Sequence, residues 1–136
     1  MFDRSKSYAA GAAAGAAAGA FVLLLAGLNL LDVGRAQSPA LEKDLFEKRC
    51  GGCHALDRDK EGPQLHGVYG RKAASVESFQ YSDALKQSKI VWTEETLERW
   101  LTDTEKLVPN NDMTVRVEKP DERRAIIAYL RHDSGK

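Results

Sequence analysis

Both cysteines of this 136-residue chain lie in one short segment, Cys50-Gly51-Gly52-Cys53-His54. Two thiols three positions apart, followed at once by an imidazole, are groups that bind metals, exchange electrons or form covalent bonds. No other segment of the sequence gathers such groups so closely. The chemistry of the protein is therefore expected here.

Three common uses of a Cys-x-x-Cys pair fit the neighbouring residues poorly. A redox dithiol of the thioredoxin type needs the pair at the start of a helix that follows a strand, whereas this pair ends a helical pattern. A zinc site needs four ligands and would recruit His54 with His66 or His132, but His54 directly follows Cys53, an awkward position for two ligands of one tetrahedral ion. A structural disulfide in an oxidising compartment is the third alternative.

Covalent attachment of haem accounts for every residue of the segment. The Cys50 and Cys53 thiols bond the two vinyl groups, and the adjacent His54 imidazole turns under the ring to bind the iron. The two glycines between them remove side-chain bulk where the backbone approaches the porphyrin edge. Haem attachment is the interpretation that this segment favours.

The iron then has a sixth position, which a ligand fills or leaves open. Met113 is the single methionine after Met1, and it lies about sixty residues after His54, in the segment Val108-Pro109-Asn110-Asn111-Asp112-Met113. A lone methionine in a loop is usually a gap filler, but Pro109 and the two asparagines stiffen this turn. We predict Met113 as the sixth ligand, with His66 and His132 as the competing candidates. His66 is expected to be a packed polar residue because its loop is rich in glycine, and His132 to be solvated at a helix end.

Residues 1–36 have the composition of an export segment. Arg4 and Lys6 precede an uncharged run from Tyr8 to Leu31, and Gly34-Arg35-Ala36 offers the small residues that a signal peptidase reads. We expect cleavage after about Ala36; retention as a membrane anchor is the alternative, because 24 uncharged residues can span a bilayer. In both cases the remaining domain, residues 37–136, lies outside the cytoplasm, in the periplasm, where covalent haem attachment takes place.

The charge of the chain argues against nucleic acid as a partner. The sequence has 20 basic and 20 acidic residues, and setting aside the three basic and two acidic residues of positions 1–36 leaves 17 and 18. Neither a net positive charge nor a basic block is present, so the electrostatic footprint of a nucleic-acid-binding protein is missing. Partners steered by charge must use local patches.

Helical periodicity predicts a small all-α domain with four to five helices and long loops. Helices are expected from about Leu41 to Cys53, over Asp83–Gln87 after a Ser82 cap, from a Thr93 cap to before Pro109, and from Pro120 to about His132. Residues 54–81 and 103–119 show little periodicity. Loops of that length in so small a domain need a large object to pack against, and a flat apolar cofactor would serve.

The chain resembles the class I c-type cytochromes, the family of mitochondrial cytochrome c and of bacterial periplasmic carriers. The similar segments run in order over nearly all of residues 41–131: C50-G51-G52-C53-H54, G62-P63-Q64-L65-H66-G67-V68-Y69-G70-R71-K72, F79-x-Y81-S82-D83-A84, I90-V91-W92, L97-x-x-W100-L101, V108-P109-x-x-x-M113 and I126-I127-A128-Y129-L130. So many ordered matches are far more specific than the haem motif alone.

The resemblance implies a role for eight residues around one haem c. Cys50 and Cys53 would form the two thioether bonds, and His54 and Met113 would bind the iron. The Pro63 carbonyl would accept the other ring proton of His54. The propionate contacts would come from Arg71, Tyr81 and Trp92. Phe46, Ile126 and Tyr129 match the crossing of the first and last helices. The fold implied is the small cytochrome c fold.

Several residues depart from the family pattern. Glu42 stands where a glycine usually allows the first and last helices to cross closely, so that crossing is expected to be looser or shifted. Trp100 replaces a tyrosine near Met113, and Glu105 and Asp112 replace lysines of the docking ring. The loop between His54 and Gly62 is also shorter than in the mitochondrial form.

The function implied by the resemblance is that of a periplasmic, single-haem electron carrier, a monomer without enzyme activity. Its donor would be a cytochrome bc complex or a periplasmic dehydrogenase, and its acceptor a terminal oxidase or reductase of a respiratory chain. The alternative is a haem enzyme or gas sensor, peroxidase-like, whose sixth ligand is labile.

Overall fold

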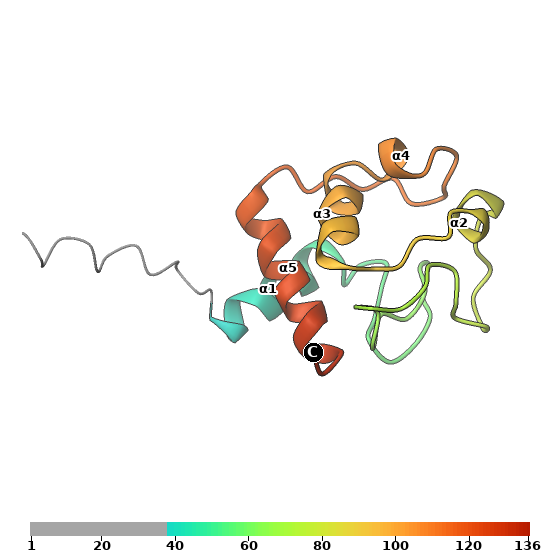
Figure 1. The fold of residues 1–136 in the computed structure, drawn as a ribbon. Helices are drawn as coiled ribbons and strands as arrows, with labels where there is room; N and C mark the ends of the chain where they lie inside the picture. Colours follow the sequence, from blue (N-terminus) through green and yellow to red (C-terminus); the bar gives the residue numbers. More distant parts are fainter. Residues whose placement is uncertain (1–37) are drawn as a thin grey trace, which may run out of the picture. The chain divides into compact units, whose positions relative to one another are not determined.

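The computed structural model describes residues 38–136, which form an all-α domain with long connecting loops (Figure 1). Its helices are α1 (Pro39–Arg49), α2 (Asp83–Gln87), α3 (Glu94–Thr102), α4 (Thr104–Leu107) and α5 (Pro120–Asp133). The predicted fold class is confirmed. No helix in residues 38–136 has the length and apolar character needed to cross a membrane, and the predicted export segment lies outside the described residues.

Helix α1 begins and ends earlier than the sequence pattern predicted. The Ser38 hydroxyl accepts a hydrogen bond from the Leu41 amide at 3.3 Å, and Pro39 occupies the first turn, where its fixed φ suits a helix start. The helix ends at Arg49, and Cys50 is its C-cap. The prediction that it continues to Cys53 was wrong, because two consecutive glycines follow Cys50 and glycine is a poor helix former.

Helices α1 and α5 cross in contact, and this crossing is the main packing interface between described helices (Figure 1). The Phe46 side chain is 1% exposed, and its ring centroid lies 4.9 Å from that of Tyr129. Glu42 is also buried at the crossing, with its Oε2 atom 3.3 Å from Nδ1 of His132. The carboxylate at the usual glycine position is therefore accommodated inside the interface and is paired with a histidine on α5.

Helix α3 forms because its first turn is capped from both directions. The Thr93 hydroxyl accepts from the Thr96 amide, and the Thr96 hydroxyl accepts from the Thr93 amide at 2.8 Å. Its apolar face buries Leu97, Trp100 and Leu101 in the core. The predicted single helix reaching to Pro109 is in fact two, because the backbone is extended at Asp103, which caps the start of α4.

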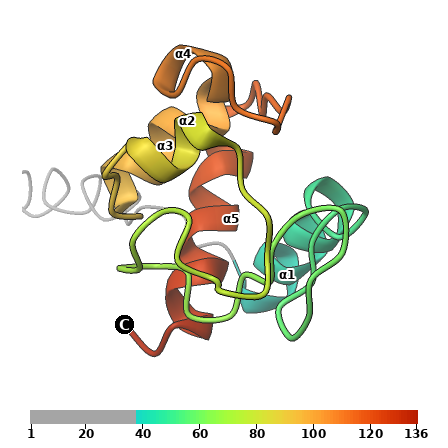
Figure 2. The ribbon, with the colours of Figure 1, turned by 90° about the vertical axis from the view of Figure 1, so that its right-hand side faces the viewer.

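The core is formed by side chains of α1, α3, α5 and the loops, whose backbone arrangement two views at right angles show (Figures 1 and 2). Its buried apolar residues come from all of these parts: Phe46, Val68, Trp92, Leu97, Trp100, Leu101, Val108, Val117, Ala125, Ile126, Ile127 and Leu130. Four of them, Val68, Trp92, Val108 and Val117, lie in segments without regular structure. The long loops therefore take part in the core and do not merely connect helices.

Candidate functional site

The Cys50–His54 segment leaves α1 as a tight turn. The amides of Cys53 and His54 both donate to the Cys50 carbonyl, at 3.0 and 2.8 Å. Cys50 is partly buried, Cys53 is exposed, and both thiols are free. Burial raises the pKa of Cys50 to about 12, and a hydrogen bond to the Glu61 carboxylate, 3.4 Å away, raises the pKa of Cys53.

These thiol environments disfavour the redox dithiol. A redox dithiol acts as a thiolate and needs a lowered pKa, whereas both thiols here have raised values. The pair also follows the C-terminal end of a helix, where the macrodipole disfavours a negative sulfur. Residues 38–136 contain no group of three or more Cys, His, Asp or Glu arranged to hold a metal ion.

His54 is buried and oriented by a backbone carbonyl. Its Nδ1 atom lies 2.8 Å from the Pro63 carbonyl oxygen, which can only accept a hydrogen bond, so Nδ1 carries the ring proton and Nε2 keeps its lone pair. Burial lowers the pKa of His54 and favours the neutral imidazole. A neutral ring with a free Nε2 and an oriented Nδ1–H is the form that binds iron.

Gly62 makes room for this imidazole. A methyl group on its Cα would lie 2.2 Å from Cε1 of His54 and 2.6 Å from Nδ1. The Gly62 amide also donates to the Cys53 carbonyl at 2.8 Å, and this hydrogen bond joins the two ends of the loop between Cys53 and Gly62. The His54 ring is therefore pressed against backbone that no other residue type could provide.

Met113 lies in the loop after α4, partly buried against the core cluster that contains Trp100. Both of its backbone groups are bound by side chains: the Thr104 hydroxyl donates to its carbonyl, and the Asn111 side-chain oxygen accepts from its amide at 2.8 Å. Free thiols and an oriented neutral imidazole beside a glycine cradle are the groups that covalent haem requires, and Met113 adds a thioether on a backbone that is bound at both peptide groups. The residues present fit that cofactor.

The family model for cytochrome c matches residues 43–134 of this chain. The chain belongs to the cytochrome c family. Cytochrome c of Gibberella zeae is 42% identical over 97 residues, which cover 68% of this chain and 91% of that protein. Cytochrome c type-1 of Ascaris suum is 40% identical, covering 69% and 87%. Among solved structures, cytochrome cH from Methylobacterium extorquens has a TM-score of 0.66 and 35% identity, and covers 71% of this chain and 99% of its own.

Membership of the cytochrome c family makes the protein a single-haem electron carrier and not an enzyme. Its cofactor is haem c with iron, and Cys50, Cys53 and His54 form the family's Cys-x-x-Cys-His motif. The partners of cytochromes c are redox proteins.

A short pairing of two loops brings Arg71 and Trp92 together. The Trp92 amide donates to the Arg71 carbonyl at 2.9 Å, and the Gly70 amide donates to the Trp92 carbonyl at 2.7 Å. The Trp92 ring is 7% exposed and lies 5.3 Å, centroid to centroid, from that of Trp100. The residue that departs from the cytochrome c pattern, Trp100, therefore extends an aromatic pair in the core.

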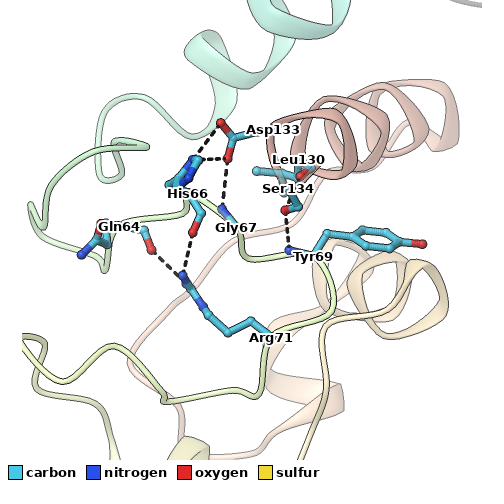
Figure 3. Close-up of polar contacts among 8 residues, drawn as sticks. All are labelled: Gln64, His66, Gly67, Tyr69, Arg71, Leu130, Asp133 and Ser134. Carbon is cyan, nitrogen blue, oxygen red and sulfur yellow. Dashed lines mark hydrogen bonds and ion pairs between the residues drawn. The ribbon is translucent and has the colours of Figure 1, made fainter. Parts of the chain in front are cut away.

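The Arg71 side chain contacts backbone carbonyls of the loop that follows His54. Its Nη atoms donate to the carbonyls of His66 and Gln64 at 2.8 and 3.0 Å (Figure 3). Burial lowers the pKa of Arg71, against the opposing effects of Tyr81 and Asp59. Burial also raises the pKa of Tyr81. A hydrogen bond to the backbone of Val76 and the charge of Arg71 act to lower it. The three residues that resemble propionate contacts thus share one neighbourhood.

His66 and His132, the competing ligand candidates, both pair with carboxylates. His66 is exposed, not packed as expected from its glycine-rich loop, and its Nδ1 atom lies 3.1 Å from Asp133 of α5. The same carboxylate accepts from the Gly67 amide, and the Ser134 hydroxyl accepts from the Tyr69 amide (Figure 3). These contacts fasten the loop after His54 to the end of α5.

Sequence reasoning missed Asp59, which joins two loops. One carboxylate oxygen accepts from the Gln64 amide at 2.8 Å and the other from the Ser78 hydroxyl at 2.6 Å. These hydrogen bonds lower the pKa of Asp59. No periodic signal marked this residue, because both partners lie in segments without helical pattern; its position four residues before Pro63 was the only indication.

Proposed function

We propose that this cytochrome c is a periplasmic carrier in which Cys50 and Cys53 would hold the haem and His54 and Met113 would bind its iron. The observation that supports it best is the His54 ring: its Nδ1–H is committed to the Pro63 carbonyl 2.8 Å away, and its Nε2 is left free. Met113 supplies the second donor because it is the single methionine of residues 38–136 and its backbone is held at both peptide groups.

The chain's own residues define how the electron is carried. A haem held by these residues would supply an iron that is reduced and oxidised by one electron. His54, made more basic by its bond to Pro63, would donate to the iron, and the thioether of Met113 would favour its ferrous state. Trp92 and Trp100 are buried, and such rings beside the cofactor would disfavour the extra charge of the ferric form. With His54 and Met113 both bound to the iron, small oxidants would have no place to bind.

The three residues Arg71, Tyr81 and Trp92 are proposed to hold a haem propionate. Arg71 provides a positive charge in partly buried surroundings, and its Nη atoms are positioned by the carbonyls of Gln64 and His66. A guanidinium held in this way neutralises a buried carboxylate without losing its orientation.

The proposed partners are redox proteins of a periplasmic respiratory chain, met by a monomer in transient encounters. A cytochrome bc complex or a periplasmic dehydrogenase would donate the electron, and a terminal oxidase or reductase would accept it. Small, short-lived interfaces suit a protein that must leave each partner after one electron. N-terminal sequencing of the mature protein, membrane fractionation and gel filtration test the leader, the location and the oligomeric state.

The visible spectrum of the oxidised holoprotein tests the ligand assignment. We expect the weak red band that marks thioether sulfur on ferric haem, and we expect Met113→Ala to abolish that band and lower the reduction potential. Thr114→Ala, at the exposed neighbouring position, is the matched control and leaves both unchanged. A wild-type protein without the band, or one that binds exogenous ligands at rest, would favour the haem enzyme or gas sensor instead.

A further inference from the structure

The segment that carries Met113 is held by side chains of its own. Between α4 and α5 the chain runs through residues 108–119 without a helix or strand, in the loop that follows α4 (Figures 1 and 2). A loop that lacks a regular hydrogen-bond pattern leaves its backbone groups free to move unless side chains bind them. In this loop the binding groups come from α4 and from Asn111.

Thr104 is the buried member of this set. Its side chain is among the largest fully buried ones, at 2% exposure, and its hydroxyl donates to the Met113 carbonyl. A buried hydroxyl is costly without a partner, so the Thr104 side chain and the Met113 carbonyl depend on each other. Thr104 is also the first residue of α4, and its carbonyl accepts a hydrogen bond from the Val108 amide at 2.9 Å, just after the helix ends. One residue therefore fixes both the start of the loop and the peptide group after Met113.

Asn111 binds the other peptide group of Met113. Its side-chain oxygen accepts from the Met113 amide at 2.8 Å, while its side-chain nitrogen donates to the Val108 carbonyl at 2.8 Å. Glu105 supports the turn from α4, because its carboxylate accepts from the Asn110 amide at 3.0 Å. Asn110 has φ 63°, a left-handed conformation that asparagine tolerates better than most residues.

The far end of the loop is also attached to the helices. The Arg116 guanidinium lies 2.8 Å from the carboxylate of Asp103, the residue that caps α4. The Val117 amide donates to the Leu101 carbonyl of α3 at 2.8 Å. Met113 is thus centred in a loop anchored before it, after it and at its own peptide groups.

We propose that Thr104 and Asn111 are positioning residues for the Met113 thioether, a role that rests on the proposed ligation by Met113. They fix the amide and the carbonyl of one residue from two directions, which restricts the directions in which the sulfur can move. A sulfur restricted in this way would bind the haem iron again before an external ligand replaced it. Thr104 and Asn111 would act through Met113 and not as ligands themselves.

Binding of imidazole to the oxidised holoprotein tests this role. Thr104→Val keeps the volume of the side chain but removes the hydroxyl, and we expect it to increase imidazole affinity by about five- to thirtyfold, as the loss of one buried hydrogen bond implies. Asn111→Ala, at a partly exposed loop position, is expected to have an effect in the same direction. Thr104→Ser keeps the hydroxyl and should restore wild-type affinity.

The matched control is Thr102→Val. Thr102 lies two residues before Thr104 and is exposed, and its hydroxyl donates to the Glu98 carbonyl of its own helix at 2.7 Å. We expect the imidazole affinity and the red band of the Thr102→Val variant to equal those of the wild type. Reduction potentials and guanidinium unfolding of all variants are measured in parallel, because a merely structural role would lower global stability without opening the sixth position selectively.

The outcomes separate the positioning role from the ligand assignment. If wild-type protein lacks the red band, ligation by Met113 fails and the positioning role fails with it. If the wild type has the band but Thr104→Val and Asn111→Ala bind imidazole as weakly as Thr102→Val does, ligation stands and the positioning role is overturned. The positioning role is equally overturned if the gain in affinity only follows the loss of global stability or if Thr104→Ser fails to restore the wild-type value.

Discussion

The two regions that carry the proposed iron ligands are built in different ways. On the histidine side, residues 50–71, the His54 ring is held by a backbone carbonyl and a glycine, and the segment is fastened to α5 through Asp133 and Ser134. In the methionine loop, residues 108–119, the contacts that position Met113 are made by side chains of that same loop and of α4. Backbone sterics dominate one region and side-chain hydrogen bonds the other.

This difference indicates where the site is rigid and where it can open. Steric contact with backbone rises steeply with displacement, whereas a hydrogen bond contributes only about 0.5–1.5 kcal/mol net and can re-form. The histidine side should therefore tolerate almost no added atom, and the methionine loop should respond gradually to single losses. Such a division suits a carrier that keeps one ligand permanently and holds the second by a set of modest contacts.

The largest effect is expected from Gly62→Ala. The new methyl group would lie 2.2 Å from Cε1 of His54, so either the imidazole leaves the Pro63 carbonyl or the backbone shifts. We expect the free energy of unfolding to fall by roughly 3 kcal/mol, at the upper end of overpacking effects. Guanidinium unfolding of the holoprotein, followed by haem absorbance, measures it.

Gly52→Ala is the matched control for that substitution. Gly52 is exposed, and a methyl group there meets no atom within 4 Å. Its cost should stay below about 0.5 kcal/mol. If the Gly62→Ala variant proves as stable as the Gly52→Ala variant, the histidine side is not the more rigid of the two regions.

A smaller loss is expected where the chain returns from the methionine loop to α5. Arg123 is 8% exposed and donates to Glu98 at 2.6 Å and to the carbonyls of Val117 and Glu118 at 2.7 and 2.9 Å. Arg123→Met leaves these acceptors without their donor. We expect about 2 kcal/mol of destabilisation in urea or guanidinium unfolding, less than for a wholly buried pair because Glu98 is partly exposed.

Arg124→Met provides the comparison for Arg123. Arg124 is largely exposed and pairs with Asp121 in the same helix, so its loss should cost no more than about 0.5 kcal/mol. Equal costs for the two arginines would mean that the returning segment is not anchored through Arg123, and that the methionine loop is freer at this end than its contacts indicate.

The parts of the fold that the sequence predicted are those with local signals. The Ser82 and Thr93 caps fix the starts of α2 and α3, and Pro120 with its acidic neighbours marks the start of α5, all at the residues where the structure has them. Each signal depends on residues within one helical turn. The Cys-x-x-Cys-His segment is equally local, which is why five consecutive residues were enough to indicate the cofactor chemistry.

The parts that the sequence did not predict depend on contacts between loops. Helix α4 has four residues, too few to show a period, and it is fixed by the Asp103 cap and by the hydroxyl of Thr104 inside the core. Asp59 binds Gln64 and Ser78, nineteen positions away in the second case, through hydrogen bonds that no spacing rule anticipates. His66 was expected to be packed because its loop is rich in glycine, but composition does not determine which side of a loop faces solvent.

A pH-dependent effect is expected on the histidine side from Asp59→Asn. The hydrogen bonds from Ser78 and from the Gln64 amide lower the pKa of Asp59, so its contribution is fully present above the unfolded pKa, about 3.9, and is lost as the pH falls through the folded value. The variant should therefore lose stability at neutral pH and show a flatter decline from about pH 5 downward. Thermal unfolding between pH 7 and pH 3 measures this slope.

Asp57→Asn is the control for the acid slope. Asp57 is exposed and contacts only the neighbouring Arg58 among the described ion pairs. Its pH profile should follow that of the wild type. A steep acid decline retained in Asp59→Asn would assign the acid sensitivity to other carboxylates and would weaken the view that Asp59 joins the two loops.

The smallest effect concerns charge, in which the two regions are alike. Residues 50–71 carry three basic and three acidic residues, and residues 108–119 carry two and two, so neither region has a net charge. We expect the rate of oxidation of the reduced protein by hexacyanoferrate(III) to change by no more than about threefold between low and moderate ionic strength, where the Debye length falls from about 30 to about 10 Å.

Asp112→Lys should make this salt dependence steeper. Asp112 is exposed beside Met113, and the substitution removes one negative charge and adds one positive charge there, where we expect the electron to leave because Met113 is a proposed ligand. Oxidation by the anionic hexacyanoferrate should become faster at low salt, while oxidation by the cationic tris(phenanthroline)cobalt(III) should become slower. If both oxidants respond alike, the electron leaves the protein far from the methionine loop, because only a charge close to the path of transfer can separate oxidants of opposite sign.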